Sequence, residues 1–214
     1  MERIICLVIG YVCGLVQTGY FYGKVHGTDL RKHGSGNSGA TNTLRVMGKK
    51  AGATVLAGDL LKCVLACVLA RLLFGAKEPE MELLYVIYAG FGVVLGHDYP
   101  VYLKFKGGKG IASTAGLIIS LLDWRVFLIC LIVFASTIFI TRYVSLGSML
   151  GATTFFLAWT VVTMTGGNNL ADSARLESCV VVLIIALLAI IRHRTNIKRL
   201  LSGTENKLGA KKQA

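Results

Sequence analysis

The sequence has few charged residues and almost no proline. Only 16% of its 214 residues are charged and two are prolines, whereas 54% are hydrophobic. A water-soluble domain carries about 25% charged residues, so this composition excludes an ordinary soluble globule. It indicates a chain whose solvent is lipid. We expect one domain that covers residues 1–214, with a basic, polar tail from about residue 202.

Several patterns of known chemistry are also missing. No histidine is followed five residues later by an aspartate, which excludes the His–Asp pair of one acyltransferase class, and no G-x-S-x-G nucleophile elbow occurs. Only Asp29, Asp98 and Glu205 lie among the basic loops, so we expect no divalent-metal site. The six cysteines lie within apolar runs and form no C-x-x-C pair. They are typical of small hydrophobic residues in helices, not of disulfides or a zinc site.

Long apolar runs are what the sequence has in abundance. A helix needs about 20 apolar residues to cross the hydrocarbon core, so each run is a candidate span. The third and fourth runs are shorter than that and must tilt, extend into the interface or be partly embedded. The sequence predicts an all-α integral membrane protein, a compact bundle of seven transmembrane helices, at about residues 4–22, 51–75, 83–96, 111–122, 126–141, 145–165 and 177–191.

Basic residues gather in alternate loops. A net charge of +12 would suggest nucleic acid in a soluble protein, but here the charge lies in short loops between apolar runs. Seven spans would put most of the lysines and arginines on one side, which the positive-inside rule assigns to the cytoplasm, with the N-terminus outside and the C-terminus cytoplasmic. Anionic substrates and the lipid bilayer are therefore better partners than nucleic acid. The four basic segments are 24–50, 97–110, 141–145 and the tail from residue 192.

The first basic segment contains a glycine-rich run from Gly34 to Arg45. It includes a G-x-G-x-x-G pattern, but a basic loop precedes it instead of a strand, so we reject dinucleotide binding. Glycines let backbone N–H groups converge on a phosphate, and arginine adds a planar, permanently charged fork. A flexible loop without a ligand is the alternative. The candidate binding residues here are Gly34, Ser35, Gly36, Asn37, Ser38, Gly39, Thr41, Asn42 and Arg45.

The second basic segment runs from Gly96 to Gly110. It looks like a P-loop but fails the pattern, because Gly110 stands where serine or threonine is required. Glycines and lysines just before a helix that begins near Ile111 would still form an anion site. A basic membrane anchor without a ligand is the alternative. The candidate residues are Lys104, Gly107, Gly108, Lys109 and Gly110.

Three smaller features complete the set of candidates. Ser145 follows a polar corner, where serine is more often a helix cap than a ligand. His193 and Asn196 are three residues apart at the end of the last span and would share a helix face, although a solvated basic tail is the alternative. Asp59 and Lys62 lie inside the second apolar run. Ionisable residues inside a membrane are functional candidates, and an internal pair that closes the bundle is the alternative.

Together, the segments Gly34–Arg45, Gly96–Gly110 and His193–Lys207 resemble the three signature motifs of the PlsY-type acyl-phosphate:glycerol-3-phosphate acyltransferases. The resemblance covers nearly the whole chain. It implies transfer of an acyl group from acyl phosphate to the sn-1 hydroxyl of glycerol 3-phosphate, which gives lysophosphatidic acid and phosphate early in phospholipid synthesis. It implies a multi-pass protein of the bacterial cytoplasmic membrane, an active site on the cytoplasmic face, no cofactor, and a functional link to the enzyme that makes acyl phosphate.

The resemblance and the charge of the substrates together suggest roles. An acyl phosphate is a mixed anhydride, so a covalent nucleophile is not required. Two unit charges about 4 Å apart repel by about 4 kcal/mol at an effective dielectric near 20, so fixed cations must offset two phosphates. We expect Ser35, Arg45 and Lys104 to bind glycerol phosphate. The proton acceptor is the substrate phosphate or His193. The acyl phosphate would be held by Gly36, Asn37, Thr41, the Gly107–Gly110 turn, Ser145, His193 and Asn196.

A transporter or channel for a phosphorylated solute is the competing class, and a membrane scaffold is the remaining one. Transporters commonly have two related halves and a midplane site in broken helices. This chain has no related halves, and its polar motifs lie on one predicted face. An acyltransferase would additionally need an apolar groove for the acyl chain, formed by several helices.

Overall fold

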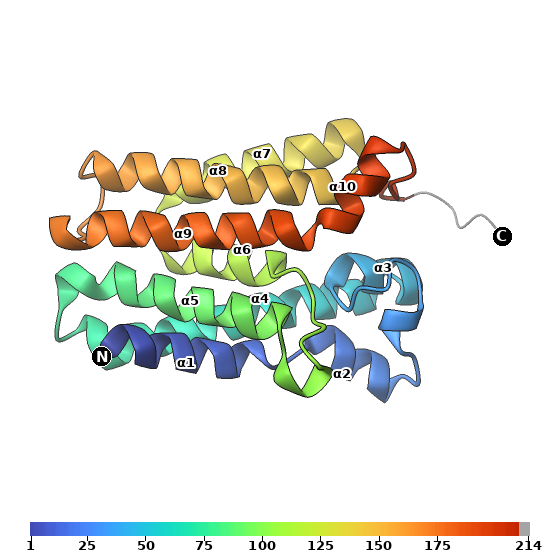
Figure 1. The fold of residues 1–214 in the computed structure, drawn as a ribbon, viewed down its shortest axis with the longest axis horizontal. Helices are drawn as coiled ribbons and strands as arrows, with labels where there is room; N and C mark the ends of the chain where they lie inside the picture. Colours follow the sequence, from blue (N-terminus) through green and yellow to red (C-terminus); the bar gives the residue numbers. More distant parts are fainter. Residues whose placement is uncertain (210–214) are drawn as a thin grey trace.

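The computed structural model describes residues 1–209, which form helices and contain no strand. Residues 210–214, at the end of the predicted basic tail, lie outside the described residues. The longer helices run side by side along one axis (Figure 1). The helices are α1 (Glu2–Gly14), α2 (Thr18–Val25), α3 (Ala40–Met47), α4 (Lys49–Ala70), α5 (Glu82–Asp98), α6 (Ile111–Ser120), α7 (Trp124–Thr141), α8 (Val144–Met164), α9 (Asp172–Arg192) and α10 (Arg194–Leu201).

Six helical segments of the described chain are long and apolar enough to cross a bilayer. They correspond to six of the seven predicted spans, so the all-α membrane bundle is confirmed. The count of seven spans and the orientation of the termini stay predictions. The six segments are Glu2–Val25, Lys49–Gly75, Pro79–Leu103, Trp124–Thr141, Val144–Met164 and Asp172–Arg192.

The predicted fourth span is α6, and it is short. Its ten residues rise only about 15 Å, half the thickness of the hydrocarbon core. An arginine from a neighbouring segment satisfies a carbonyl at its far end, because Arg71 donates to the Ser120 carbonyl at 3.0 Å. Arg125, at the start of α7, donates instead to the Gly167 carbonyl at 2.6 Å and so connects α7 to the loop between α8 and α9.

The predicted first span is two helices, not one. α1 ends at Gly14 and α2 begins at Thr18, and the break leaves backbone carbonyls without helical partners. Lys62 on α4 donates to the Gly14 and Val16 carbonyls at 3.3 and 2.7 Å. Gln17, which is 1% exposed, donates to the Gly14 carbonyl at 3.3 Å. A buried lysine far along the chain and a glutamine within the break thus stabilise a break that hydropathy alone does not reveal.

Helices α1 and α5 pack with their backbones in close contact. Gly10 and Gly14 on α1 face Gly92 and Gly96 on α5. A Cβ added at Gly10 would lie 3.0 Å from the Gly92 Cα, and one added at Gly14 would lie 2.9 Å from the Gly96 Cα. Small residues four apart let membrane helices approach closely, which gives the van der Waals contact that holds them together in lipid.

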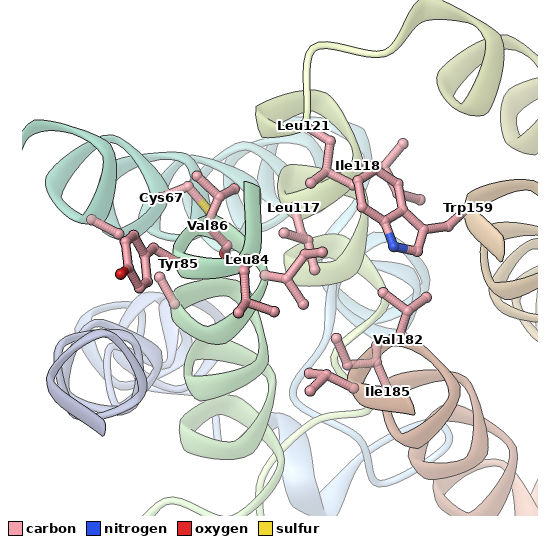
Figure 2. Close-up of a cluster of buried hydrophobic side chains, with 14 of the residues drawn as sticks. Cys67, Leu84, Tyr85, Val86, Leu117, Ile118, Leu121, Trp159, Val182 and Ile185 are labelled. Carbon is pink, nitrogen blue, oxygen red and sulfur yellow. Dashed lines mark hydrogen bonds between the residues drawn. The ribbon is translucent and has the colours of Figure 1, made fainter. Parts of the chain in front are cut away.

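The apolar core lies between α4, α5, α6, α8 and α9 (Figure 2). Leu84, Leu117 and Ile185 are fully buried there. Trp159 is also fully buried, and its indole N–H donates to the Ser178 hydroxyl at 3.1 Å, so the one polar atom of this large side chain is satisfied. Helix α7 packs mainly on α8 and exposes most of its apolar side chains, as a lipid-facing helix does.

The path of the chain gathers the predicted motifs at one end of the bundle. The N-terminus lies at the opposite end from α10 (Figure 1). The loops before α3, before α6 and before α8 lie at the α10 end, together with the C-terminal tail. Four basic segments that are far apart in sequence therefore meet, as a site built from all four requires.

The glycine contact between α1 and α5 gives a test of the fold. We expect Gly10→Ala to destabilise the protein by about 1–3 kcal/mol, because the new methyl group meets the Ala89 backbone carbonyl, which cannot move aside. Thermal unfolding in detergent would measure this. Gly151→Ala on α8 is the matched control, since its Cβ would lie 3.7 Å from the Phe134 side chain. Equal unfolding temperatures for the two variants would contradict the role of the glycine contact.

Candidate active site

The four basic segments surround a cavity of about 420 Å³ at the α10 end of the bundle. Its wall has two chemically distinct parts. Loops and helix starts supply polar and charged groups, whereas α4, α6, α7 and α8 supply an apolar groove that continues from them. Side chains of that groove include Leu56, Leu60, Ala115, Ile118, Phe127 and Leu131. The cavity therefore suits a ligand with an anionic head and a hydrocarbon chain.

The structure brings most of the predicted site residues together. The cavity wall contains Ser35, Asn37, Gly39, Thr41, Asn42, Arg45, Lys109, Gly110, Ser145, His193 and Asn196. Other predicted residues lie in the same loops but outside the wall, namely Gly34, Gly36, Ser38, Gly107 and Gly108.

Lys104 also lies outside the cavity wall, and it is the predicted lysine that the structure does not bring to the cavity. It is exposed, follows a short helical turn, and has a left-handed backbone conformation with φ of 54°. The lysine of the same loop that reaches the cavity is Lys109. A role for Lys104 in binding glycerol phosphate stays a prediction from the family resemblance.

Asn42 organises the first glycine-rich loop. It is 2% exposed, and its side-chain N–H₂ donates to the carbonyls of Leu30, His33 and Asn37 at 3.1, 3.0 and 2.8 Å. Its oxygen accepts the backbone N–H of Ser35 at 2.8 Å. These bonds fold the loop back on itself. Gly34 and Gly36, with φ of 60° and 73°, allow the required left-handed turns. Asn42 therefore shapes the loop that presents Ser35, and its oxygen also accepts a hydrogen bond from Arg45 on α3 at 3.5 Å.

Four helices begin at the cavity. The first turns of α3, α6 and α8 line it, and so does Asn196 in the first turn of α10. The first N–H groups of a helix have no partner inside the helix, and the aligned peptide dipoles give that end a partial positive charge. Within residues 1–209 no group accepts the N–H of Ala40 or Thr41. Several helix N-termini at one cavity form a site that can bind an anion.

The glycine turn before α6 packs against the end of α5. Gly107 and Gly108 donate to the carbonyls of Asp98 and His97 at 3.1 and 3.0 Å. A side chain at Gly108 would run into the His97 ring, and Gly110 has φ of 69°, so glycine is needed at both positions. These bonds occupy the first two N–H groups of the turn, whereas those of Lys109 and Gly110 have no acceptor within residues 1–209.

A buried carboxylate holds the polar wall together. The Glu205 side chain is 4% exposed and accepts hydrogen bonds from Ser145 at 3.0 Å, Asn196 at 2.8 Å and Arg199 at 2.7 Å. Lys109 donates to the Asn196 side-chain oxygen. Glu205 and Arg199 were not among the predicted site residues. The sequence signal for Glu205 is that it is a single acidic residue within a basic tail. Its spacing from other residues does not show which of them it contacts.

His193 presents one nitrogen to the cavity. Its Nδ1 lies 2.7 Å from the Ala189 carbonyl, so Nδ1 carries the proton and Nε2 is the acceptor. Burial, together with the charge of Lys109, lowers the pKa of His193 to about 4. The ring is therefore neutral near pH 7 and accepts a hydrogen bond, but it has a low affinity for a proton.

The inner end of the polar wall contains Asp59 and His97. Lys62 lies between them: its ammonium is 2.9 Å from the Asp59 carboxylate and 2.8 Å from His97 Nδ1. The Asp59–Lys62 pair does connect helices of the bundle, because Lys62 on α4 also donates hydrogen bonds to carbonyls at the break between α1 and α2. His97 lies within the second basic segment, but it was not predicted as a site residue.

A donor-rich, cationic pocket that continues into an apolar groove defines a membrane protein that handles an anionic group attached to a hydrocarbon chain. The comparison with known families agrees with this class. The family model described as glycerol-3-phosphate acyltransferase matches residues 4–203. The chain belongs to the glycerol-3-phosphate acyltransferase family.

Individual relatives match over their whole length. The chain is 43% identical to a glycerol-3-phosphate acyltransferase of Halalkalibacterium halodurans, covering 100% of this chain and 99% of the relative. It is 41% identical to one of Thermoanaerobacter sp. (strain X514), covering 99% and 98%.

Solved structures extend the comparison. Two crystal structures of PlsY, an integral membrane glycerol 3-phosphate acyltransferase, superpose on this fold. Its glycerol 3-phosphate form has a TM-score of 0.81 at 33% identity, and its lysophosphatidic acid form has a TM-score of 0.79 at 32% identity. Each comparison covers 98% of this chain and 96% of PlsY. The resemblance to the PlsY type that the motifs indicate is confirmed.

Lys109 gives the site a pH dependence with a definite sign. Burial lowers the pKa of Lys109 to about 8, and the charge of Arg199 acts in the same direction. The ammonium is charged below that pH and is lost as the pH rises through it. We expect kcat/KM for an anionic substrate to fall above about pH 8, because this ratio reports the free enzyme.

Arginine stays charged throughout this range, so Lys109→Arg should remove the alkaline decline while leaving measurable turnover. Profiles of kcat/KM between pH 6 and 10 for both proteins would test this. If the variant retained the same decline, Lys109 would not be its source.

Proposed function

We propose that the protein transfers an acyl group from acyl phosphate to the sn-1 hydroxyl of glycerol 3-phosphate, giving lysophosphatidic acid and phosphate. The observation that carries the proposal is the two-part cavity, in which several cationic groups and helix starts meet the end of an apolar groove. The PlsY structures, in their glycerol 3-phosphate and lysophosphatidic acid forms, support the same substrate and product here.

Each part of the substrates has a complementary part of the cavity. The acyl chain lies in the groove between α4, α6, α7 and α8. The start of α6 and Lys109 bind the acyl phosphate, whereas Ser35 and Arg45 bind glycerol phosphate, with Lys104 added from the resemblance. Fixed cations offset the repulsion of two phosphates, which would otherwise be about 4 kcal/mol for two unit charges 4 Å apart at an effective dielectric near 20. Catalysis then rests on positioning and electrostatic stabilisation.

The chemical step forms one bond and breaks one bond. The sn-1 oxygen of glycerol 3-phosphate attacks the acyl carbon, the bond from that carbon to the phosphate oxygen breaks, and its electron pair leaves with phosphate. The hydroxyl proton passes to a phosphate oxygen. A phosphate has a second pKa of about 6, whereas that of His193 is about 4, so phosphate is the stronger base. His193 Nε2 orients the hydroxyl by accepting its hydrogen bond.

The site faces the cytoplasm in this proposal. The basic segments that surround the cavity lie at one end of the bundle, and the positive-inside rule assigns that end to the cytoplasmic side of a bacterial membrane. Glycerol 3-phosphate then enters from water, and acyl phosphate reaches the groove from the lipid side. The enzyme that makes acyl phosphate is a functional partner and need not form a stable complex.

Reconstituted activity tests the proposal. We expect the purified protein alone to convert acyl phosphate and radiolabelled glycerol 3-phosphate into a labelled lysolipid, with the acyl group at sn-1. Acyl-CoA should not replace acyl phosphate. Arg45→Ala should lose about 100-fold or more in kcat/KM, since a displaced phosphate costs that much.

Arg31→Ala is the matched control for Arg45→Ala. Arg31 lies in the same basic segment, 24–50, but is exposed and paired with Asp29 at 3.0 Å. It should keep wild-type activity. Product formed from acyl-CoA but not from acyl phosphate, or an sn-2 product, would overturn the proposed reaction, and equal activity of the two arginine variants would overturn the role of Arg45.

The apolar groove predicts a dependence on chain length. Ala115 lies on α6 in the middle of the groove, so Ala115→Phe should block a long acyl chain while leaving the polar end open. We expect turnover of palmitoyl phosphate to fall at least about tenfold and turnover of a two- to four-carbon acyl phosphate to change little.

Ala135→Phe provides the control for Ala115→Phe. Ala135 lies on α7, is exposed and does not line the cavity. Kinetics with both chain lengths would be compared for the two variants. Equal losses with long and short donors in Ala115→Phe would show that the groove does not hold the acyl chain.

A further inference from the structure

Arg192, the last residue of α9, binds the glycine turn from behind. Its guanidinium donates to the Gly107 carbonyl at 3.1 Å and to the Gly108 carbonyl at 3.1 and 2.8 Å. It also lies 5.0 Å above the centre of the Tyr99 ring and 3.9 Å from the Asp98 carboxylate. Both of these partners stand at the end of α5, so one side chain connects α9, α5 and the turn.

These carbonyls have a particular position relative to α6. In a regular helix the N–H of residue i bonds the carbonyl of residue i−4. The Gly107 and Gly108 carbonyls are therefore the acceptors that Ile111 and Ala112 would use if α6 continued backwards. Arg192 occupies them instead. Within residues 1–209 no group accepts the N–H of Lys109, Gly110, Ile111 or Ala112.

The N–H groups left free are the ones at the cavity. Lys109, Gly110, Ile111 and Ala112 all line its wall. Arg192 itself does not line the cavity, so it does not contact a ligand held there. Its effect on binding must pass through the backbone of the turn.

We propose that Arg192 is a positioning residue that keeps the start of α6 open as a phosphoryl-binding site by bonding the carbonyls that would otherwise extend the helix. The inference rests on the proposed function for the identity of the phosphoryl compound, which is acyl phosphate. It also links the turn to His193, the next residue of the chain, so two parts of the site are set by one side chain.

The geometry of the guanidinium distinguishes this role from a general effect of charge. Lysine keeps the positive charge but cannot donate to two carbonyls as a planar fork. If only charge mattered, Arg192→Lys would behave as wild type. If the fork matters, Arg192→Lys and Arg192→Gln are impaired alike.

The experiment measures kcat, both KM values and phosphate binding for these two variants. We expect the KM for acyl phosphate to rise about tenfold or more in both, because small displacements of binding groups have effects of this size. The KM for glycerol 3-phosphate should change much less. Arg194→Lys is the matched control, since Arg194 lies two residues away and is exposed.

Inorganic phosphate provides a measurement that does not need turnover. A ligand that binds the folded state raises its unfolding temperature, so added phosphate should raise that of wild type and Arg194→Lys, and much less that of the Arg192 variants. An unchanged phosphate shift and unchanged KM in Arg192→Lys would overturn the inference. So would a fall in kcat alone, or a loss of activity that only follows the unfolded fraction. Failure of the proposed function would instead be seen in wild type, as phosphate binding without acyl transfer from acyl phosphate.

Discussion

Like charges crowd around the cavity, and their mutual repulsion has to be balanced inside the protein. Arg45, Lys109 and Arg199 all lie in its wall, beside the positive ends of several helices. The buried carboxylate of Glu205 supplies the balance, since it bonds Arg199 directly and Lys109 through Asn196. Because its partners come from the start of α8 and from α10, the same carboxylate holds separate segments in place. A site with excess positive charge can then exist before any anion arrives, which is what preorganised binding of phosphate requires.

A second buried polar cluster supports the first. Lys62 on α4 contacts Asp59, His97 and the carbonyls at the break between α1 and α2. Buried charges are tolerated when they are paired and when their remaining hydrogen bonds are made, as they are here. The close glycine contact of α1 with α5 brings that break beside the end of α5, against which the glycine turn packs. The packing of the membrane helices and the shape of the site are therefore parts of one arrangement.

The membrane bundle could be predicted because hydrophobicity over about 20 residues depends on local sequence alone. The break at Gln17 could not, since it is stabilised by Lys62, which is distant in sequence and stands within another apolar run. The shortness of the fourth run was evident from the sequence, whereas the bond from Arg71 to the far end of α6 was not, because Arg71 belongs to another segment. Within the site, glycine-rich loops were recognised by their donors. Which lysine of the second loop reaches the cavity depends on the path of the loop in space, and the structure places Lys109 there.

By itself, the sequence determined that this chain is a membrane protein, that its basic and glycine-rich segments belong to one side, and that they resemble the motifs of a phosphate-handling acyltransferase. Composition, charge distribution and motif spacing are local properties, so they can be read without a fold. Only the tertiary structure decided that Glu205 and Arg199 lie within the site, that Asn42 shapes a loop, and that Arg192 bonds the glycine turn from behind. Those roles arise from contacts between segments that are remote along the chain. Hydrogen bonds of this kind depend on where helices bring side chains in space.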